Sequence, residues 1–256
     1  MIKAVFFDMD GTIYSHKTNC VPESTRIALD TLRENGVMVF LATGRHFVEI
    51  EDFPVGKMNF DGYVMLNGQI CTDSDRKIVF GNPIEGKDSE YLLNAFNNKE
   101  IPIMIVEKDQ MYMNLVDEMV VKGQAEISTP IPEIQEYEGA PIFQFICYGG
   151  KELEERLASI LEKCKITRWC PFGIDIISKT GGKVTGIKKM LEHYGVTEQE
   201  IIAFGDAEND LDMIEFAGIG VAMGNAKDEV KAVADYVTTD VDENGIWNAC
   251  KYFGLI

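Results

Sequence analysis

Short apolar runs alternate with a helical pattern near the start of the chain, and this alternation constrains the fold more than any other feature. Residues 3–7, 37–42 and 62–66 have the composition of buried strands. Residues 24–36 show the apolar spacing of an amphipathic helix that stops at Gly36. Strands separated by helices pair in parallel, because the helical crossover returns the chain to the same end of the sheet. The sequence therefore predicts an α/β protein with a Rossmann-like parallel sheet.

The pattern changes between residues 83 and 181 and then returns. Within this stretch paired strands and helices follow one another, including a charged amphipathic helix over residues 151–164, which indicates an inserted α+β unit. The βα alternation resumes with a helix over residues 183–194. We therefore predict a core domain formed by residues 1–82 and 182–256, with residues 83–181 inserted into it as a separate domain.

The chain is strongly acidic, with 42 Asp and Glu against 24 Lys and Arg and a formal net charge of −18. Such a surface repels the phosphate backbone of nucleic acids and anionic lipid headgroups, so we expect neither a nucleic acid nor a membrane as a partner. The same charge repels a phosphorylated substrate unless a metal cation and a few basic side chains reverse the potential locally. A phosphate-binding site in this chain would therefore call for a bound cation.

The cysteine pattern and the N-terminus both bear on location. The six cysteines are scattered without a C-x-x-C pair, which argues against a structural zinc site and a redox motif. Asp8 and Asp10 interrupt the first apolar run, so the N-terminus lacks the pattern of a signal peptide. The longest apolar runs are far too short to cross a bilayer. We expect a cytoplasmic location.

Two acidic clusters directly follow predicted strands. Asp8 and Asp10 follow the first strand, and Asp206 and Asp210 follow a strand predicted over residues 201–204. Ligands of an open parallel sheet bind at the carboxyl ends of its strands. An Asp-Gly turn after a strand is common, so the first cluster alone is ambiguous. Two acidic clusters at one edge of a sheet predict a hard-cation site, and oxygen ligands suit magnesium better than zinc.

Two other ligand-binding motifs, the EF-hand and the P-loop, do not match this sequence. An EF-hand calcium loop starting in the second cluster would need Gly and Glu where Leu211 and Ala217 stand. A P-loop would need Ser or Thr after Lys183, where Val184 stands. We therefore predict no calcium site, and nucleotide binding of the P-loop kind is disfavoured.

Four motifs stand in order along the chain: DMDGT at 8–12, LATGR with Thr43, Lys183, and GDAEND at 205–210. Together they resemble the four motifs of the haloacid dehalogenase-type (HAD) phosphatases. The size and position of the insert resemble the Cof-type subgroup, in which a large α+β cap domain selects the substrate. The third motif departs from the family pattern, because Val184 follows the lysine where glycine is frequent.

The resemblance implies a mechanism centred on the two acidic clusters. Asp8 would be the nucleophile that attacks phosphorus, and Asp10 would be the general acid and base, oriented by Thr12. A Mg²⁺ ion would be held by Asp8, the backbone carbonyl of Asp10 and Asp206. Asp210 would support the metal without being a principal ligand.

The resemblance also implies a set of phosphate-binding residues. Thr43, the amide of Gly44 and Lys183 would hold phosphate oxygens, and Asn209 would donate a further hydrogen bond. Three nearby lysines are alternatives to Lys183: Lys179, Lys188 and Lys189. Each residue taken alone has a structural interpretation as a turn, an exposed side chain or a helix cap. The joint order of the motifs favours the functional interpretation.

The sequence thus predicts a magnesium-dependent phosphatase that acts on a small phosphorylated metabolite, such as a sugar phosphate. A phosphomutase or phosphotransferase would use the same intermediate on Asp8 but pass the phosphate to another hydroxyl. A non-catalytic sensor of a phosphorylated ligand would be favoured by a missing carboxylate, whereas Asp8, Asp10 and Asp206 are all present. The sequence predicts neither the individual substrate, nor the residues that select it, nor the oligomeric state.

Overall fold

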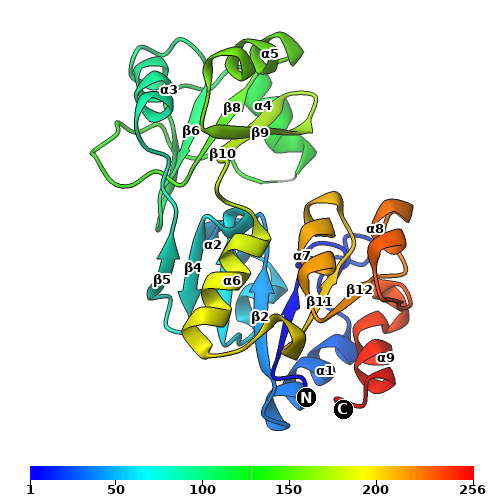
Figure 1. The fold of residues 1–256 in the computed structure, drawn as a ribbon. Helices are drawn as coiled ribbons and strands as arrows, with labels where there is room; N and C mark the ends of the chain where they lie inside the picture. The colour runs from blue at the N-terminus through cyan, green and yellow to red at the C-terminus, as the bar shows by residue number, and fades with distance from the viewer. Residues whose placement is uncertain (128) are drawn as a thin grey trace. The chain divides into compact units, whose positions relative to one another are not determined.

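A computed structural model describes residues 1–127 and 129–256 of the chain. It divides into two compact units. The first consists of Met1–Phe80 and Gly182–Ile256, and the second is Gly81–Gly181. The first unit contains a mainly parallel sheet with helices, and the second contains an antiparallel sheet with helices (Figure 1). The predicted fold class, a parallel-sheet α/β core with an inserted α+β domain, is confirmed.

The sheet of the first unit has eight strands in the order β13-β12-β11-β1-β2-β3-β4-β5. The strands are β1 (Ala4–Phe7), β2 (Met38–Ala42), β3 (Gly62–Met65), β4 (Ile70–Asp73), β5 (Ile78–Gly81), β11 (Ile201–Gly205), β12 (Ile219–Ala222) and β13 (Tyr236–Val237). The central strand β1 pairs in parallel with β2 on one side and with β11 on the other. Only beyond β3 does the direction change, because β4 runs antiparallel to β3. Strands far apart in the sequence therefore end side by side at one edge.

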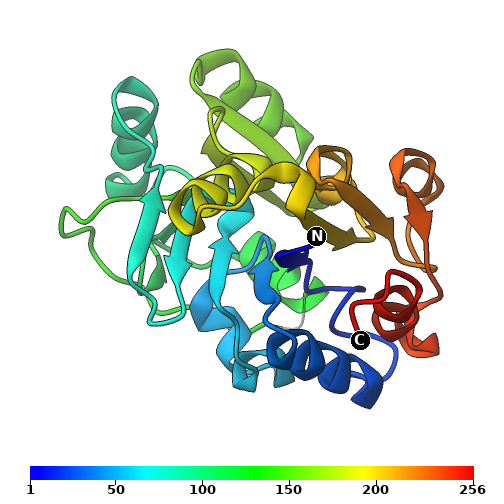
Figure 2. The same ribbon diagram turned by 60° about the horizontal axis from the view of Figure 1, so that its bottom comes forward.

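Helices cover both faces of this sheet (Figure 2). The α-helices are α1 (Glu23–Glu34), α2 (Phe47–Glu51), α6 (Lys183–Tyr194), α7 (Leu211–Phe216), α8 (Asp228–Val233) and α9 (Gly245–Tyr252). Short 3₁₀ helices are η1 (Pro54–Lys57), η2 (Leu66–Gly68), η3 (Glu198–Glu200), η4 (Glu208–Asp210) and η5 (Val241–Glu243). The helices α6 and α7 lie on one face, and α1 and α9 contact each other on the opposite face.

The central strand is apolar along its whole length because helices cover both of its faces. Phe6 points to the face covered by α6 and stacks on Phe40, with ring centroids 4.6 Å apart. Phe7 points to the other face and stacks on Phe204, with centroids 4.8 Å apart. Packing on both faces fixes where each strand ends in the sheet. It therefore also fixes the positions of the polar residues that follow the strands.

The second unit is built on a five-stranded sheet in the order β7-β6-β8-β10-β9, in which neighbouring strands pair antiparallel. Its strands are β6 (Ile103–Val106), β7 (Met111–Met113), β8 (Gln144–Tyr148), β9 (Cys164–Cys170) and β10 (Gly173–Ser178). Its helices are α3 (Lys87–Asn97), α4 (Glu118–Glu126) and α5 (Lys151–Ile160). Residues of α3 and α5 pack against the sheet in a core cluster of the unit's own. The unit thus has the core expected of an independent domain.

The elements predicted over the parallel-sheet core lie within one or two residues of those in the structure, whereas one predicted helix of the second unit ends too late. The helix over 183–194 and the start of β1 differ from the prediction by at most one residue. The helix predicted over 151–164 instead stops at Ile160, and Cys164 begins β9. The chain turns there because the side chain of Asp88 accepts hydrogen bonds from the backbone N–H groups that follow the helix. None of the helices in the described residues is both long and apolar enough to cross a membrane.

Asp88 joins two parts of the second unit and provides a test of its packing. Its oxygens accept the N–H groups of Glu162 at 3.2 Å and Lys163 at 2.7 Å. Replacing Asp88 with Ala leaves both groups without this acceptor, so we expect a loss of about 2 kcal/mol and a thermal midpoint lower by about 4–8 °C. Glu90→Ala removes a charge from the same helical turn at an exposed position. Equal midpoints for the two variants, followed by circular dichroism, would contradict this role of Asp88.

Candidate active site

The site lies where the strand order reverses. From β1 the chain adds β2 and β3 on one side, whereas β11, β12 and β13 lie on the other side. Such a switch point leaves a crevice at the carboxyl ends of the strands, because the loops there leave in opposite directions. Asp8 directly follows β1, Thr43 follows β2, and Asp206 follows β11. Three of the sequence motifs are therefore brought together by the sheet itself.

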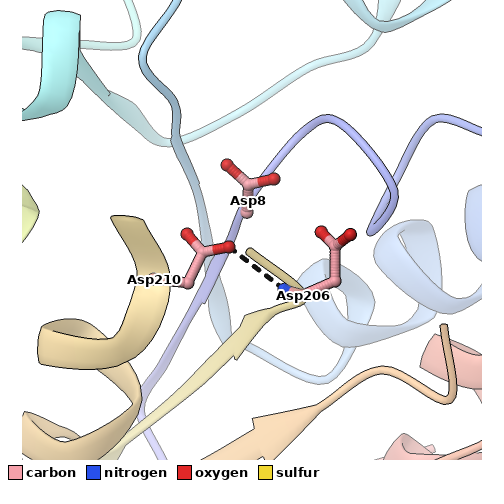
Figure 3. A group of neighbouring side chains, drawn as sticks. All are labelled: Asp8, Asp206 and Asp210. Carbon is pink, nitrogen blue, oxygen red and sulfur yellow. Dashed lines mark hydrogen bonds between the residues drawn. The ribbon is translucent and has the colours of Figure 1, made fainter. Parts of the chain in front are cut away.

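A group of three carboxylates forms the centre of the site. Asp8, Asp206 and Asp210 each offer an oxygen within 4.8 Å of the others. Figure 3 shows the three carboxylates directed to the same side, from the end of β1, the end of β11 and the turn that begins α7. Hydrogen bonds fix this arrangement, since the second oxygen of Asp210 accepts the backbone N–H groups of Asp206 and Ala207, each at 3.0 Å.

The fourth member of the group is a buried lysine. Lys183 begins α6, and its Nζ lies 2.6 Å from Oδ1 of Asp8 and 2.6 Å from Oδ1 of Asp210. Burial alone would lower the pKa of Lys183, but the charges of Asp210 and Asp8 outweigh it, so the pKa lies above its ordinary value. Lys183 is therefore a permanent cation between two carboxylates.

The acidic group carries more negative charge than Lys183 balances. Burial, together with the charge of Asp210, raises the pKa of Asp8 well above its ordinary value, although Lys183 opposes the shift. The same two causes raise the pKa of Asp206 to about 6. When all three carboxylates are ionised, they exceed the one ammonium by two negative charges, and a bound cation would favour this ionised form; oxygen donors are the ligands that Mg²⁺ prefers. The donor set therefore fits a hard divalent cation held by Asp8 and Asp206.

The DMDGT loop packs directly on Asp206. The hydroxyl of Thr12 donates to Oδ1 of Asp206 at 3.2 Å, and Asn225 donates to Oδ2 at 3.3 Å and to the carbonyl of Gly11 at 2.8 Å. Gly11 has a φ of +78°, and a Cβ at this position would collide with the carboxylate of Asp206. Thr12, expected to orient Asp10, instead contacts the carboxylate of the fourth motif.

Asp10 lies outside the group formed by Asp8, Asp206 and Asp210, and two basic side chains bind it. Arg45 donates from Nε to Oδ2 at 2.7 Å and from Nη2 to Oδ1 at 3.0 Å. Nε2 of His16 also lies 2.7 Å from Oδ1. Burial acts to raise the pKa of Asp10, but the bonds from His16 and Arg45 outweigh it and leave the pKa below its ordinary value. The side chain of Asp10 is thus held as a carboxylate.

Arg45 and His16 are not among the residues predicted from the sequence. Arg45 stands in the LATGR motif, directly after the predicted phosphate-binding pair, so its position gives a partial signal. The guanidinium also lies over the ring of Phe53, 4.5 Å from its centroid, which fixes its direction. His16 has no sequence signal, because only the folding of the loop after β1 brings it to Asp10.

The predicted phosphate-binding residues surround the same strand ends. Thr43 is buried, and its Oγ1 accepts the N–H of Arg45 at 3.1 Å. Asn209 lies in η4 and donates from Nδ2 to Oδ1 of Asn67 at 3.2 Å. Gly44 lies against the side chain of Asn67. Asn67, which follows β3, therefore links two residues predicted to bind phosphate.

Comparison with known proteins identifies the family. Residues 5–250 match the family model for haloacid dehalogenase-like hydrolases. The chain belongs to this family. YkrA of Bacillus subtilis, provisionally named a phosphatase, is 35% identical over 99% of this chain and 98% of its own length.

Two solved structures of HAD phosphatases resemble the whole chain. BT1666 from Bacteroides thetaiotaomicron superposes with a TM-score of 0.88 and 30% identity over 100% of this chain and 96% of its own. BT4131, described as a HAD subclass IIB sugar phosphatase, superposes with a TM-score of 0.81 and 34% identity over 99% of this chain and 100% of its own. The resemblance deduced from the four motifs is confirmed, and the chain is a HAD-type phosphatase.

The HAD fold places only one of the four candidate lysines beside Asp8. The others have different contacts: Lys179 donates to the carbonyl of Glu162, Lys188 lies over the ring of Phe216, and Lys189 pairs with Glu192. Lys183 is the buried one, with both carboxylates at 2.6 Å.

Replacing Lys183 with Met should strongly destabilise this HAD protein. The variant leaves Asp8 and Asp210 buried without their counter-charge, so we expect the free energy of unfolding to fall by about 3–5 kcal/mol. Lys189→Met removes a charge from the same helix but breaks only a half-exposed pair, and should change stability by less than about 0.5 kcal/mol. Denaturant titration measures both values in metal-free buffer. Similar losses in the two variants would contradict the buried contact of Lys183 with Asp8 and Asp210.

Proposed function

We propose that this chain is a magnesium-dependent phosphatase that hydrolyses a small phosphorylated metabolite through an aspartyl-phosphate on Asp8. The observation that carries the proposal is the placement of Asp8 against Lys183 at the carboxyl end of the central strand, with Asp206 and Asp210 beside it. A nucleophilic carboxylate needs nearby positive charge to approach an anionic phosphate. Lys183 supplies part of that charge.

The first step is an attack by Asp8 on phosphorus. Lys183 contacts Oδ1 of Asp8, and we assign the attack to Oδ2. The new bond joins this oxygen to phosphorus, and the bond from phosphorus to the ester oxygen breaks. Asp10 in its acid form gives a proton to the leaving oxygen. In the second step Asp10 takes a proton from water, which attacks phosphorus, releases inorganic phosphate and restores the carboxylate of Asp8.

This role requires Asp10 to exchange its present partners. Both oxygens of Asp10 are engaged by Arg45 and His16, which favour the ionised form. An acid that donates to a leaving group must be protonated and must face that group. We therefore infer that substrate binding releases at least one of these contacts before the first step.

The phosphate would be held from two sides of Asp8. Thr43 and the amide of Gly44 follow β2, and Asn209 follows β11, so their donors lie on either side of the central strand. Lys183 adds positive charge next to the phosphate through its contact with Asp8. Hydrogen bonds to a charged phosphoryl group are stronger than those between neutral groups, so a few of them suffice to orient it.

A bound Mg²⁺ ion would neutralise charge on the transferring phosphoryl group. Asp8, the backbone carbonyl of Asp10 and Asp206 would hold it, and Asp210 would support it through its bonds to the backbone of Asp206 and Ala207. The excess negative charge of the carboxylate group supports this assignment.

The substrate is proposed to be a small phosphomonoester such as a sugar phosphate. BT4131, a structural neighbour, is described as a sugar phosphatase, which supports this class. The acidic surface of the chain disfavours nucleic acid and anionic membrane as alternatives. We propose that the inserted unit, residues 83–181 in the predicted division, selects among such substrates.

Asp8→Asn should abolish phosphate release from a panel of phosphorylated metabolites while leaving the fold intact. The amide cannot act as the nucleophile, so we expect a loss on the order of 10⁴-fold or more in kcat. Asp212→Asn changes an exposed aspartate near the fourth motif and should retain activity. Undiminished turnover by the Asp8 variant would refute the nucleophile. Transfer of phosphate to an added sugar, without free phosphate, would indicate a mutase or phosphotransferase.

Removal of divalent metal tests the proposed cation site. Treatment with a chelator should abolish turnover, and added Mg²⁺ should restore it. Because a ligand that binds the folded state raises its stability, Mg²⁺ should also raise the thermal midpoint of the unmodified protein. Asp206→Asn should lose this stabilisation, whereas Asp212→Asn should keep it. An equal response to Mg²⁺ in both variants would argue against Asp206 as a ligand.

A further inference from the structure

The turn after β3 has an unusual backbone. Leu66, Asn67 and Gly68 all have positive φ values, of 51°, 51° and 83°. Residues with a Cβ avoid this left-handed region at a cost of about 1–2 kcal/mol each, and consecutive examples are uncommon. Such a conformation persists only where the surroundings fix it. The contacts that hold the turn in this conformation therefore indicate its role.

Backbone contacts tie the turn to two other loops of the site. The N–H of Asn67 donates to the carbonyl of Thr43 at 3.1 Å, and the N–H of Leu66 donates to the carbonyl of Arg45 at 3.3 Å. A Cβ at Gly68 would collide with the carbonyl of Gly182, the residue before Lys183. The turn is thus hydrogen-bonded to the loop after β2 and lies close against the start of α6.

The side chain of Asn67 lies between two residues proposed to bind phosphate. Its Oδ1 accepts the Nδ2 group of Asn209 at 3.2 Å. The same carboxamide lies against Gly44, where a Cβ would approach Nδ2 to 3.1 Å and Oδ1 to 3.3 Å. Any side chain at position 44 would press on Asn67. Gly44 and Asn209 come from opposite sides of β1, so Asn67 spans the site.

We propose that Asn67 is a positioning residue for phosphate binding, an inference that rests on the proposed function. Its carboxamide holds the amide of Asn209 and packs on the backbone of Gly44, so that both donors face one phosphoryl group. Asparagine suits this task for two reasons. It adopts the left-handed conformation more readily than most residues with a Cβ, and it offers a neutral acceptor to Asn209.

Three substitutions separate the side chain from the backbone conformation. Asn67→Gly removes the carboxamide but tolerates the positive φ, so the turn itself is retained. Asn67→Asp keeps an acceptor for Asn209 but places a negative charge near the bound phosphate. Asn209→Ala removes the partner. If Asn67 acts through Asn209, then the effects of Asn67→Gly and Asn209→Ala should not add.

The experiment measures inorganic phosphate binding by calorimetry at saturating Mg²⁺, together with kcat and KM for the best substrate of the panel. We expect Asn67→Gly to weaken phosphate binding about 5–20-fold, the range of one or two lost hydrogen-bond contributions. The loss in the double variant with Asn209→Ala should be smaller than the product of the two single losses. Asn67→Asp should bind more weakly than Asn67→Gly. The Mg²⁺ concentration for half-maximal activation should not change, because the Asn67 carboxamide is hydrogen-bonded to Asn209 and not to Asp8, Asp206 or Asp210.

Four outcomes would overturn the inference. Unchanged phosphate binding in Asn67→Gly, with full activity in the unmodified protein, would refute it while leaving the proposed function intact. Additive effects in the double variant would show that Asn67 does not act through Asn209. A parallel loss of Mg²⁺ activation would assign the turn a general structural role. Failure of the unmodified protein to bind phosphate or to release it from any substrate would refute both proposals.

Discussion

The buried contact of Lys183 with Asp8 and Asp210 is the interaction on which the rest of the site depends. Each charge alone would be costly to bury, and only their mutual contact at 2.6 Å offsets that cost. The contacts among Lys183, Asp8 and Asp210 join the end of β1, the start of α6 and the turn before α7. The three carboxylates Asp8, Asp206 and Asp210 outnumber the one ammonium of Lys183, which favours the proposed cation. One arrangement thus serves folding and the proposed chemistry together.

The parallel sheet supplies the geometry in which this contact forms. Because β1 lies between β2 and β11, the loops that carry Asp8, Thr43 and Asp206 end at the same edge although they are far apart in the chain. Stacked rings on both faces, such as Phe6 on Phe40, fix the positions of neighbouring strands relative to one another. Neighbouring loops then refine the site, as Arg45 and His16 do at Asp10. Rigid strands position the site, and the loops after them provide its chemistry.

The sequence predicts those features that depend on local pattern. Continuous apolar runs identify the buried strands, and carboxylates directly after Phe7 and Gly205 identify the site, because strand ends are where parallel sheets bind ligands. Features that depend on distant contacts are not predictable in this way. The end of α5 at Ile160 is set by Asp88, and the direction of Asp10 is set by His16. The left-handed turn at Asn67 likewise needs partners from other loops to hold it.

The order of the strands also has a consequence for synthesis of the chain. The central strand, Ala4–Phe7, is made before its neighbour Ile201–Gly205, and the whole second unit, Gly81–Gly181, lies between them in the sequence. One edge of β1 therefore stays unpaired while these residues are made, and its contacts close over long sequence distances, which slows folding and exposes apolar surface. Asp8 meanwhile remains in water, since Lys183 has not yet been added. The contacts around Asp8 can therefore form only after Lys183 and the strand β11 have been made.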